Sequence, residues 1–343
     1  MTDILNKIAV SGLLALVGLC QPAYADVVLD SAEKLSAFGD FRLRGEYDER
    51  TKNDGTEQSR NRLRYRARLG MAFRVNDRWS ARMRLATNIS SINSPHVTFG
   101  GDPDIGFDQA YLKYRGDSIK IMAGKQPLNY WNSSEMVWDK DFNPDALGFV
   151  YNRQNFTLNA AHIILQESNW DNRDQRIDML QGLYRSHSVI LALGYFNNND
   201  GGAAETVGTF SAQYKAADWR SVIELSVSDA AIENQAWSLQ FRKNLARGMG
   251  LRIYYMYVEA QSIPGDGKYG QDDFPDQNGS GLSNFQGLRL QYDQQLDKNL
   301  AMDVRLYNMR AINDDFAAAA APGNPYFADD NRTRLQININ LKF

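Results

Sequence analysis

The stretch RNRLRYRARL at residues 60–69 constrains the fold most, because arginine occupies every second position. The residues between these five arginines are Asn61, Leu63, Tyr65, Ala67 and Leu69. A helix would distribute the arginines around its circumference, whereas a strand places all five on one face and the mostly apolar residues on the other. The stretch therefore predicts a strand that separates an apolar environment from an aqueous one.

From residue 36 to the C-terminus the dominant hydrophobic period is two. Amphipathic strands of about ten residues with aromatic residues near their ends are typical of outer-membrane barrels. The predicted strands are 36–48, 60–75, 78–90, 106–115, 118–126, 145–152, 155–166, 175–186, 188–197, 205–215, 219–228, 235–243, 249–260, 284–293, 299–310 and 331–343. We therefore predict an all-β fold, a transmembrane antiparallel β-barrel of about sixteen strands.

The connections between these strands alternate between long and short, which supports the same fold. The long ones are 49–59, 91–105, 127–144, 167–174, 198–204, 229–234, 261–283 and 311–330. Outer-membrane barrels have long extracellular loops and short periplasmic turns. An even strand count places both ends of the barrel in the periplasm.

Residues 1–25 are predicted to be a signal peptide, with an apolar core at 8–19 and AYA at 23–25 before cleavage. Cys20 leaves a lipoprotein alternative open, although the bulky Leu19 precedes it. The predicted barrel domain spans residues 26–343 and begins with a short periplasmic lead, 26–35. Because Cys20 is the only cysteine, the exported chain is expected to fold without disulfides.

Several segments resemble the putative porin family of Gram-negative outer membranes. They are RLRYRARLGMAFRVNDRWSARMRLATN at 62–88, TFGG at 98–101, DQAYLKY at 108–114, AGKQPLNYW at 123–131 and VWDKDFNPDALGFVY at 137–151. The terminal NLKF ends on Phe343, the aromatic residue typical of barrels delivered to the outer-membrane assembly machinery. The resemblance implies an outer-membrane diffusion channel, monomeric or trimeric, and supplies no catalytic residue.

The arginines indicate the chemistry of the predicted channel. A lipid-facing arginine costs about 2–4 kcal/mol at the bilayer midplane, so these side chains must face water inside the barrel. Closure of the barrel brings the last strand beside the first, and Lys342 extends the same face. The predicted pore-lining basic wall consists of Arg42, Arg44, Arg60, Arg62, Arg64, Arg66, Arg68, Arg82, Arg84, Arg332 and Arg334. The alternative is that arginine is merely one of the polar residues that a wet lumen requires.

The loop at 127–144 is predicted to form the constriction, since the resembling barrels fold the loop after this strand inward. Its acidic residues are Glu135, Asp139 and Asp141, with Asp145 just after it. Acidic residues opposite a basic wall would create a transverse field that favours dipolar solutes. The alternative is an outward surface loop with solvated acidic residues.

Other residues support structural interpretations. The aromatic residues expected at the membrane interfaces are Tyr47, Tyr65, Trp79, Tyr114, Trp219 and Phe343. The DPD motif at 102–104 and Asp272, Asp273 and Asp276 could hold calcium or bridge lipopolysaccharide, or could be solvated loop acids. By parity, Tyr111 and Tyr254 face the lumen and could stack against sugars.

Enzyme activity is not expected, because none of His96, His162 and His187 has an obvious serine partner. We expect no cofactor, no bound metal and no nucleic-acid partner. The expected partners are outer-membrane lipid and lipopolysaccharide, the assembly machinery through Phe343, small solutes and two further copies in a homotrimer.

The favoured hypothesis is an outer-membrane porin for passive diffusion of small hydrophilic solutes, with a preference for anions. The alternatives are a channel selective for an acidic sugar, phosphate or organic acid, and a structural or adhesion barrel whose lumen is plugged by 261–283 or 311–330.

Overall fold

The computed structural model describes residues 27–28, 34–91, 94–167, 174–199, 203–246, 248–271, 273–274, 283–318 and 326–343. The predicted signal peptide, residues 1–25, lies outside the described residues. Within the described part of the chain, no helix is long and apolar enough to cross a membrane.

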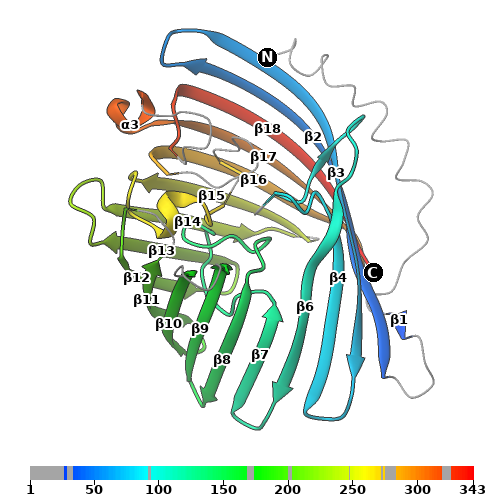
Figure 1. Cartoon of the computed structure of the whole chain (residues 1–343). Helices are drawn as coiled ribbons and strands as arrows, with labels where there is room; N and C mark the ends of the chain where they lie inside the picture. Colours follow the sequence, from blue (N-terminus) through cyan, green and yellow to red (C-terminus); the bar gives the residue numbers. More distant parts are fainter. Residues whose placement is uncertain are drawn as a thin grey trace.

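Sixteen long strands form the structure (Figure 1). They are β2 (Leu35–Lys52), β3 (Glu57–Arg74), β4 (Trp79–Thr87), β6 (Ile105–Arg115), β7 (Ile119–Lys125), β8 (Asp145–Arg153), β9 (Phe156–Gln166), β10 (Gln175–Arg185), β11 (Val189–Asn199), β12 (Thr206–Lys215), β13 (Trp219–Ser228), β14 (Gln235–Asn244), β15 (Met249–Val258), β16 (Phe285–Asp297), β17 (Leu300–Ala311) and β18 (Asp329–Lys342). The short elements are β1 (Val27–Val28), β5 (Val97–Thr98), η1 (Pro264–Gly267) and α3 (Asp314–Ala318).

The long strands form one closed antiparallel barrel. Each pairs with its neighbours along the chain, and β18 pairs with β2, with Arg334 opposite Asp48 and Asn338 opposite Arg44. Closure leaves no unpaired edge, which is the condition for a sheet to reside in lipid. The predicted class, strand number and adjacency of the first and last strands are confirmed.

The connection predicted at 49–59 is shorter than expected. β2 continues to Lys52 and β3 begins at Glu57, so only residues 53–56 connect them. This extended hairpin lies at the top of Figure 1. Polar pairs hold its two strands together, for example Arg60 with Asp48 at 2.7 Å. Charged residues there obscured the apolar alternation from which the strand bounds were predicted.

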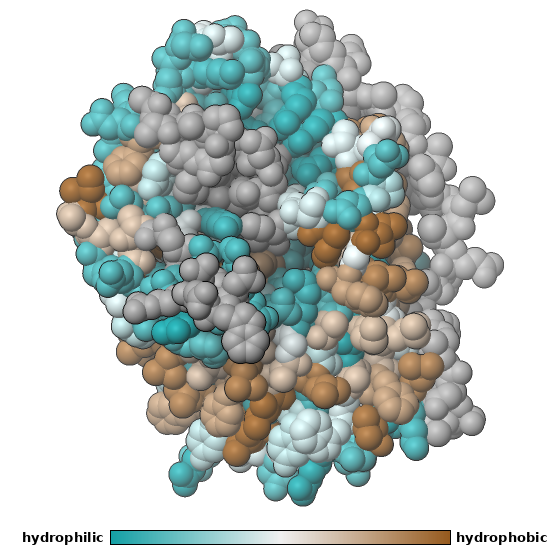
Figure 2. Space-filling view, viewed as in Figure 1, coloured by the Kyte–Doolittle hydropathy of each residue, from teal (hydrophilic) through white to brown (hydrophobic). Residues whose placement is uncertain are grey.

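The outward faces of the strands are apolar. Leu63, Leu69, Met71, Phe73 and Met83 are among the exposed large side chains of β3 and β4. Figure 2 shows hydrophobic side chains gathered over the lower half of the barrel, with hydrophilic ones above them and at the lower rim. This distribution is the one that a lipid bilayer requires of a barrel.

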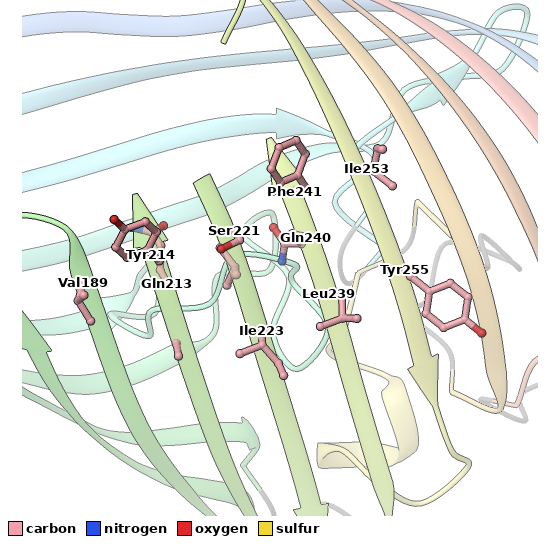
Figure 3. Close-up of a pocket in the computed structure, with 12 residues that line it drawn as sticks. Val189, Gln213, Tyr214, Ser221, Ile223, Leu239, Gln240, Phe241, Ile253 and Tyr255 are labelled. Carbon is pink, nitrogen blue, oxygen red and sulfur yellow. The ribbon is translucent and has the colours of Figure 1, made fainter. Parts of the chain in front are cut away.

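A shallow groove of about 670 Å³ lies on the outward face of β12–β15 (Figure 3). The small side chains of Ala212 and Ser221 leave space there between Ile223, Leu239 and Phe241. Because most of its lining residues have outward parity, we assign the groove to the lipid-facing surface rather than to the lumen.

Two connections fold into the barrel and pack against the inward faces of the strands. They are 126–144, which joins β7 to β8, and the described part of 259–284, which joins β15 to β16. Trp138, Tyr269 and Phe274 from these connections are buried against inward residues such as Phe196 and Tyr307. The largest apolar core therefore lies inside the barrel, on one side of the lumen.

Candidate functional site

The lumen-facing basic residues lie on adjoining strands. In the β2–β3 register Arg42 lies opposite Arg66 and Arg44 opposite Arg64. Directly opposed side chains of like charge are unfavourable unless other groups offset the charge. The arrangement therefore depends on acidic partners.

Carboxylates supply that offset for most of the predicted basic wall. Nine of its eleven arginines have a carboxylate oxygen of the described residues within 4.0 Å. The acidic partners of the nine include Asp40, Glu46, Asp48, Asp108, Asp141, Asp273 and Asp329. Eleven arginines against these seven carboxylates leave a formal excess of four positive charges.

Asp48 holds the upper part of the basic wall together. Its carboxylate accepts hydrogen bonds from Arg332 and Arg334 at 2.9 and 3.0 Å, and it also bonds Arg60. Lower on the same strands, the Glu46 carboxylate bonds Arg62. Asp40, Glu46 and Asp48 share the parity of Arg42, so alternation could have predicted their position.

Asp141 attaches the infolded connection 126–144 to the basic wall through ion pairs. Its two carboxylate oxygens lie 2.8 Å from an Arg66 nitrogen and 2.6 Å from an Arg68 nitrogen. Asp40 bonds the same two arginines at 2.7 and 2.8 Å. Burial alone would raise the pKa of Asp141, but the charges of Arg66 and Arg68 outweigh it and hold that pKa well below its usual range.

The second infolded connection contributes an equivalent acidic residue. Asp273 lies 3.2 Å from Arg44 and also pairs with Arg305 on β17. Burial would raise its pKa, but the charges of Arg44 and Arg305 hold the pKa of this carboxyl well below its usual range. Arg305 and its further partner Asp303, 2.5 Å away, extend the ion-pair network onto β17 and were missed in the sequence.

Glu224 anchors the first half of the same connection on the opposite side of the barrel. Its carboxylate accepts the backbone N–H of Ser133 at 2.6 Å and of Ser134 at 2.8 Å. The side chains of Gln240 and Ser238 also donate to it, at 3.1 and 3.2 Å. Glu224 is 3% exposed, so these bonds satisfy a carboxylate that burial would otherwise penalise.

The connection 126–144 thus spans the lumen, from Glu224 on β13 to the arginines of β3. Trp138 and Phe142 stack against each other and against Tyr269, with ring centroids 5.0 to 5.6 Å apart. These contacts hold the Asp141 side chain against the basic wall. A cavity of about 160 Å³ lies beside Asp141, lined also by Asp108 and Asn143.

The other predicted constriction acids lie elsewhere. Glu135 pairs with Lys140 at 2.5 Å, and Asp139 accepts the backbone N–H of Asp141. Asp145 lies on the outward face at the start of β8, is 65% exposed and is 3.9 Å from Lys125. Its assignment to the constriction was wrong, because a shift of one residue at the start of a strand moves a side chain to the other face.

Arg42 and Arg82 contact neutral groups. Arg42 donates to Asn340 at 2.6 Å and lies 3.5 Å from Nε2 of His96. Burial, followed by the charges of Arg44 and Arg42, lowers the pKa of His96 well below its usual value. His96 is therefore neutral at pH 7. The Arg82 guanidinium stacks on Phe38, 3.4 Å from the ring centroid, and the remaining wall member Arg84 bonds Asp108.

The described residues contain no group of three or more His, Cys, Asp or Glu side chains that could hold a metal ion. Of the loop acids considered for calcium, Asp272 and Asp276 lie outside the described residues, and Asp273 belongs to the ion pairs above. Tyr254 faces the lumen, but its ring stacks on Arg289 at 3.7 Å. Tyr111 has the inward parity that was predicted.

Comparison with known proteins defines the class. The barrel resembles OmpF of Salmonella typhi, in a complex with daunomycin, with a TM-score of 0.60 and 11% identity over 93% of this chain and 100% of that one. OmpT of Vibrio cholerae in its trimer form has a TM-score of 0.57 and 13% identity over 93% of this chain and 100% of that one. A mutant porin of Rhodopseudomonas blastica has a TM-score of 0.58 and 9% identity over 90% of this chain and 100% of that one. The fold is that of an outer-membrane porin.

The sequence comparison narrows this class. Residues 33–166 match the model of a family described as putative porins, which confirms the resemblance over that part of the chain. A comparison with curated proteins found no match. The family match and the porin fold together support a channel located in the outer membrane.

Proposed function

We propose that the barrel is a water-filled channel for passive diffusion of small hydrophilic solutes, with a preference for anions. The observation that carries this proposal is the lumen-facing basic wall, whose eleven arginines exceed their seven carboxylate partners by four. The infolded connection 126–144 narrows the same region and places Asp141 against Arg66 and Arg68. Solutes that pass this region would meet a wall of arginines whose charge Asp141 offsets only in part.

Reversal potentials of the purified full-length protein in planar bilayers test this proposal. In a salt gradient we expect a stable conductance with permeability greater for chloride than for potassium. Replacing Arg62, Arg64, Arg66 and Arg68 by Gln should move the reversal potential toward cations. A protein that inserts but does not conduct, or a cation-selective wild type, would refute the proposal.

A channel selective for an acidic sugar, phosphate or organic acid is the second candidate. The position of Arg42 favours it, because the side-chain hydrogen bonds of this lumen-facing arginine go, among the described residues, to the neutral Asn340 and His96. An anionic solute could bind this guanidinium, for which the described residues supply no carboxylate hydrogen bond. Saturating flux of one anion, lost in R42Q, would distinguish this candidate from passive diffusion, which gives flux proportional to concentration.

We propose no catalytic role for the histidines. His162 bonds Asp178 at 2.6 Å on the outward face of the barrel, and His187 lies exposed in a short turn. Among the described residues, the hydrogen-bond partners observed for the His96 and His162 rings include no serine, threonine or cysteine. Hydrolysis of lipid or peptide substrates by the purified barrel would contradict this assignment.

We further propose assembly as a homotrimer, supported by the solved trimer form of the structurally similar OmpT of Vibrio cholerae. The C-terminal Phe343 faces outward at the end of β18, where its backbone N–H bonds the Gly39 carbonyl. This position supports recognition by the outer-membrane assembly machinery, and the apolar outward faces support contact with lipid and lipopolysaccharide. Light scattering of the detergent complex tests the trimer, and deletion of Phe343 tests the assembly step by the amount of barrel in the membrane.

A further inference from the structure

A second group of basic residues lies near the short turns, at the opposite end of the barrel from the β2–β3 hairpin. Its members are Lys113, Lys120, Arg185, Lys215, Arg220 and Arg242, which lie on β6, β7, β10, β12, β13 and β14, respectively. In the part of the chain that the structure describes, none of the six has a carboxylate oxygen within 4.0 Å. This separates them from the basic wall, where carboxylates pair with nine of eleven arginines.

Strand parity places these side chains on the inward face. Arg220 has the parity of Glu224, which bonds the infolded connection, and Arg242 has that of Gln240, which accepts a bond from the Ser133 hydroxyl. Their hydrogen-bond partners are neutral. Arg242 donates to Asn244 at 3.1 Å, and Lys120 and Arg185 likewise donate to an asparagine and a threonine.

Four basic residues in this region form one row across adjacent strands. Lys215 lies opposite Arg220, Arg220 opposite Arg242, and Arg242 opposite Arg252. Neighbouring strands are about 4.8 Å apart, so the row extends over about 14 Å. Among the residues that the structure describes, only its last member, Arg252, has a carboxylate within 4.0 Å, that of Asp293 at 2.5 Å. We call Lys215, Arg220, Arg242 and Arg252 the basic row.

The row is unfavourable for the isolated barrel, because like charges directly opposite each other destabilise a sheet. Serine, threonine or glutamine would keep the lumen wet without this repulsion. The spacing between neighbours is also shorter than the Debye length of about 8 Å at physiological salt, so their fields overlap. An anion bound along the row would offset charges that the described protein residues leave uncompensated.

We propose that the basic row binds solutes that carry two or more anionic groups, phosphate or carboxylate, at the short-turn mouth of the channel. This inference rests on the proposed channel function and gives the channel a second, sided site, separate from the basic wall. Guanidinium groups bind both phosphate and carboxylate in bidentate geometry. A multivalent anion can bridge neighbours about 4.8 Å apart, whereas a monovalent anion engages them singly.

The test uses the full-length protein in planar bilayers at roughly 0.1 M salt, where charges separated by more than about 10 Å are screened. Inorganic tripolyphosphate is the probe. We expect it to block the current more strongly from one side, and we expect the half-blocking concentration to rise at least tenfold in K215Q/R220Q/R242Q. The matched control is K243Q, because Lys243 has the outward parity on the same strand and pairs with Asp218.

Equal block of the triple variant and the wild type would overturn the proposal, as would an equal shift in K243Q. The single variant R242Q, expected to raise the half-blocking concentration two- to fivefold, answers the question if the triple variant does not fold. Calorimetric titration of the detergent-solubilised protein with tripolyphosphate separates this proposal from the channel function. If the wild type binds tripolyphosphate, loses that binding in the variants and does not conduct, only the channel function is refuted. If the wild type neither binds tripolyphosphate nor conducts, both the basic-row proposal and the channel function are refuted.

Discussion

Replacing Asp141 by Asn removes the carboxylate by which the connection 126–144 bonds Arg66 and Arg68 of the basic wall. The carboxylate makes two charge-assisted hydrogen bonds, at 2.8 Å to Arg66 and 2.6 Å to Arg68. Each such bond contributes about 1.5–3 kcal/mol, and the asparagine oxygen can retain one weaker bond. Because Asp40 still bonds both arginines, neither is left without a partner. We therefore expect a net loss of about 2 kcal/mol of local stability.

That loss corresponds to about a 30-fold shift in the equilibrium between attached and detached connection. Hydrogen exchange of the Asp139 and Gln271 amides measures it, because these groups donate to the Tyr269 and Glu135 carbonyls only while the two infolded connections remain packed. Exchange should accelerate about 10- to 30-fold in D141N. The loss of one negative charge from the lumen should also move the reversal potential further toward anions.

The matched control is D145N, which changes the net charge of the chain equally. Asp145 lies on the outward face of β8, so its replacement should alter neither amide exchange nor selectivity. If D141N and D145N behave alike in both measurements, the attachment of the connection through Asp141 is not what holds it in the lumen. If D145N alone changed selectivity, the assignment of the two faces of β8 would be wrong.

Glu224, Gly70 and the titration of Asp141 allow three further tests. E224Q should lose about 2 kcal/mol of local stability, because an amide NH2 replaces an oxygen that accepts backbone N–H groups. The backbone amides of Ser133 and Ser134 should therefore exchange faster in E224Q than in the exposed control E205Q. G70A should lower barrel stability in urea by about 1–3 kcal/mol, because its Cβ would lie 2.3 Å from the Phe38 ring, whereas G182A, with open space, should not. Because the pKa of Asp141 is lowered, its ion pairs stabilise the attached connection 126–144 fully above about pH 5, and this stabilisation is lost only as the pH falls below about 4. Conductance should therefore be constant from pH 8 to 5.

The strands were predictable because lipid on one side and water on the other impose period two on every segment. The parity of Arg62, Arg64 and Arg66 followed directly, and barrel closure placed Arg334 beside β2. The acidic partners within the strands could also have been predicted, since Asp40 and Asp48 alternate in phase with Arg42. The prediction erred by counting only the cations of each face.

The partners from the infolded connections could not be predicted in the same way. Asp141 and Asp273 follow no period, and their distance from Arg66 and Arg44 depends on how irregular backbone packs inside the barrel. Asp145 shows the same difficulty at the start of a strand, where a shift of one residue in the predicted strand moves a side chain from the lumen to the outward face. Composition indicated acidic residues in the connection, but only its three-dimensional path shows that Asp141 bonds Arg66 and Arg68 of the basic wall.

The pairing of the basic wall also affects how its role in selectivity should be tested. Replacing Arg62 alone removes a charge and takes from Glu46 its nearest cation, since Arg64 lies 3.9 Å away, so a shift toward cations would overstate the contribution of the native pair. The double variant R62Q/E46Q removes both charges and keeps the net charge of the lumen. A close ion pair produces a much weaker field at a distance than an unpaired charge, so this variant should leave the reversal potential nearly unchanged. Neutralising Lys215, Arg220 and Arg242, whose charges the described carboxylates do not pair, should shift it toward cations. If the double variant produced the larger shift, selectivity would depend on the paired arginines themselves, and the basic row would have no special part in it.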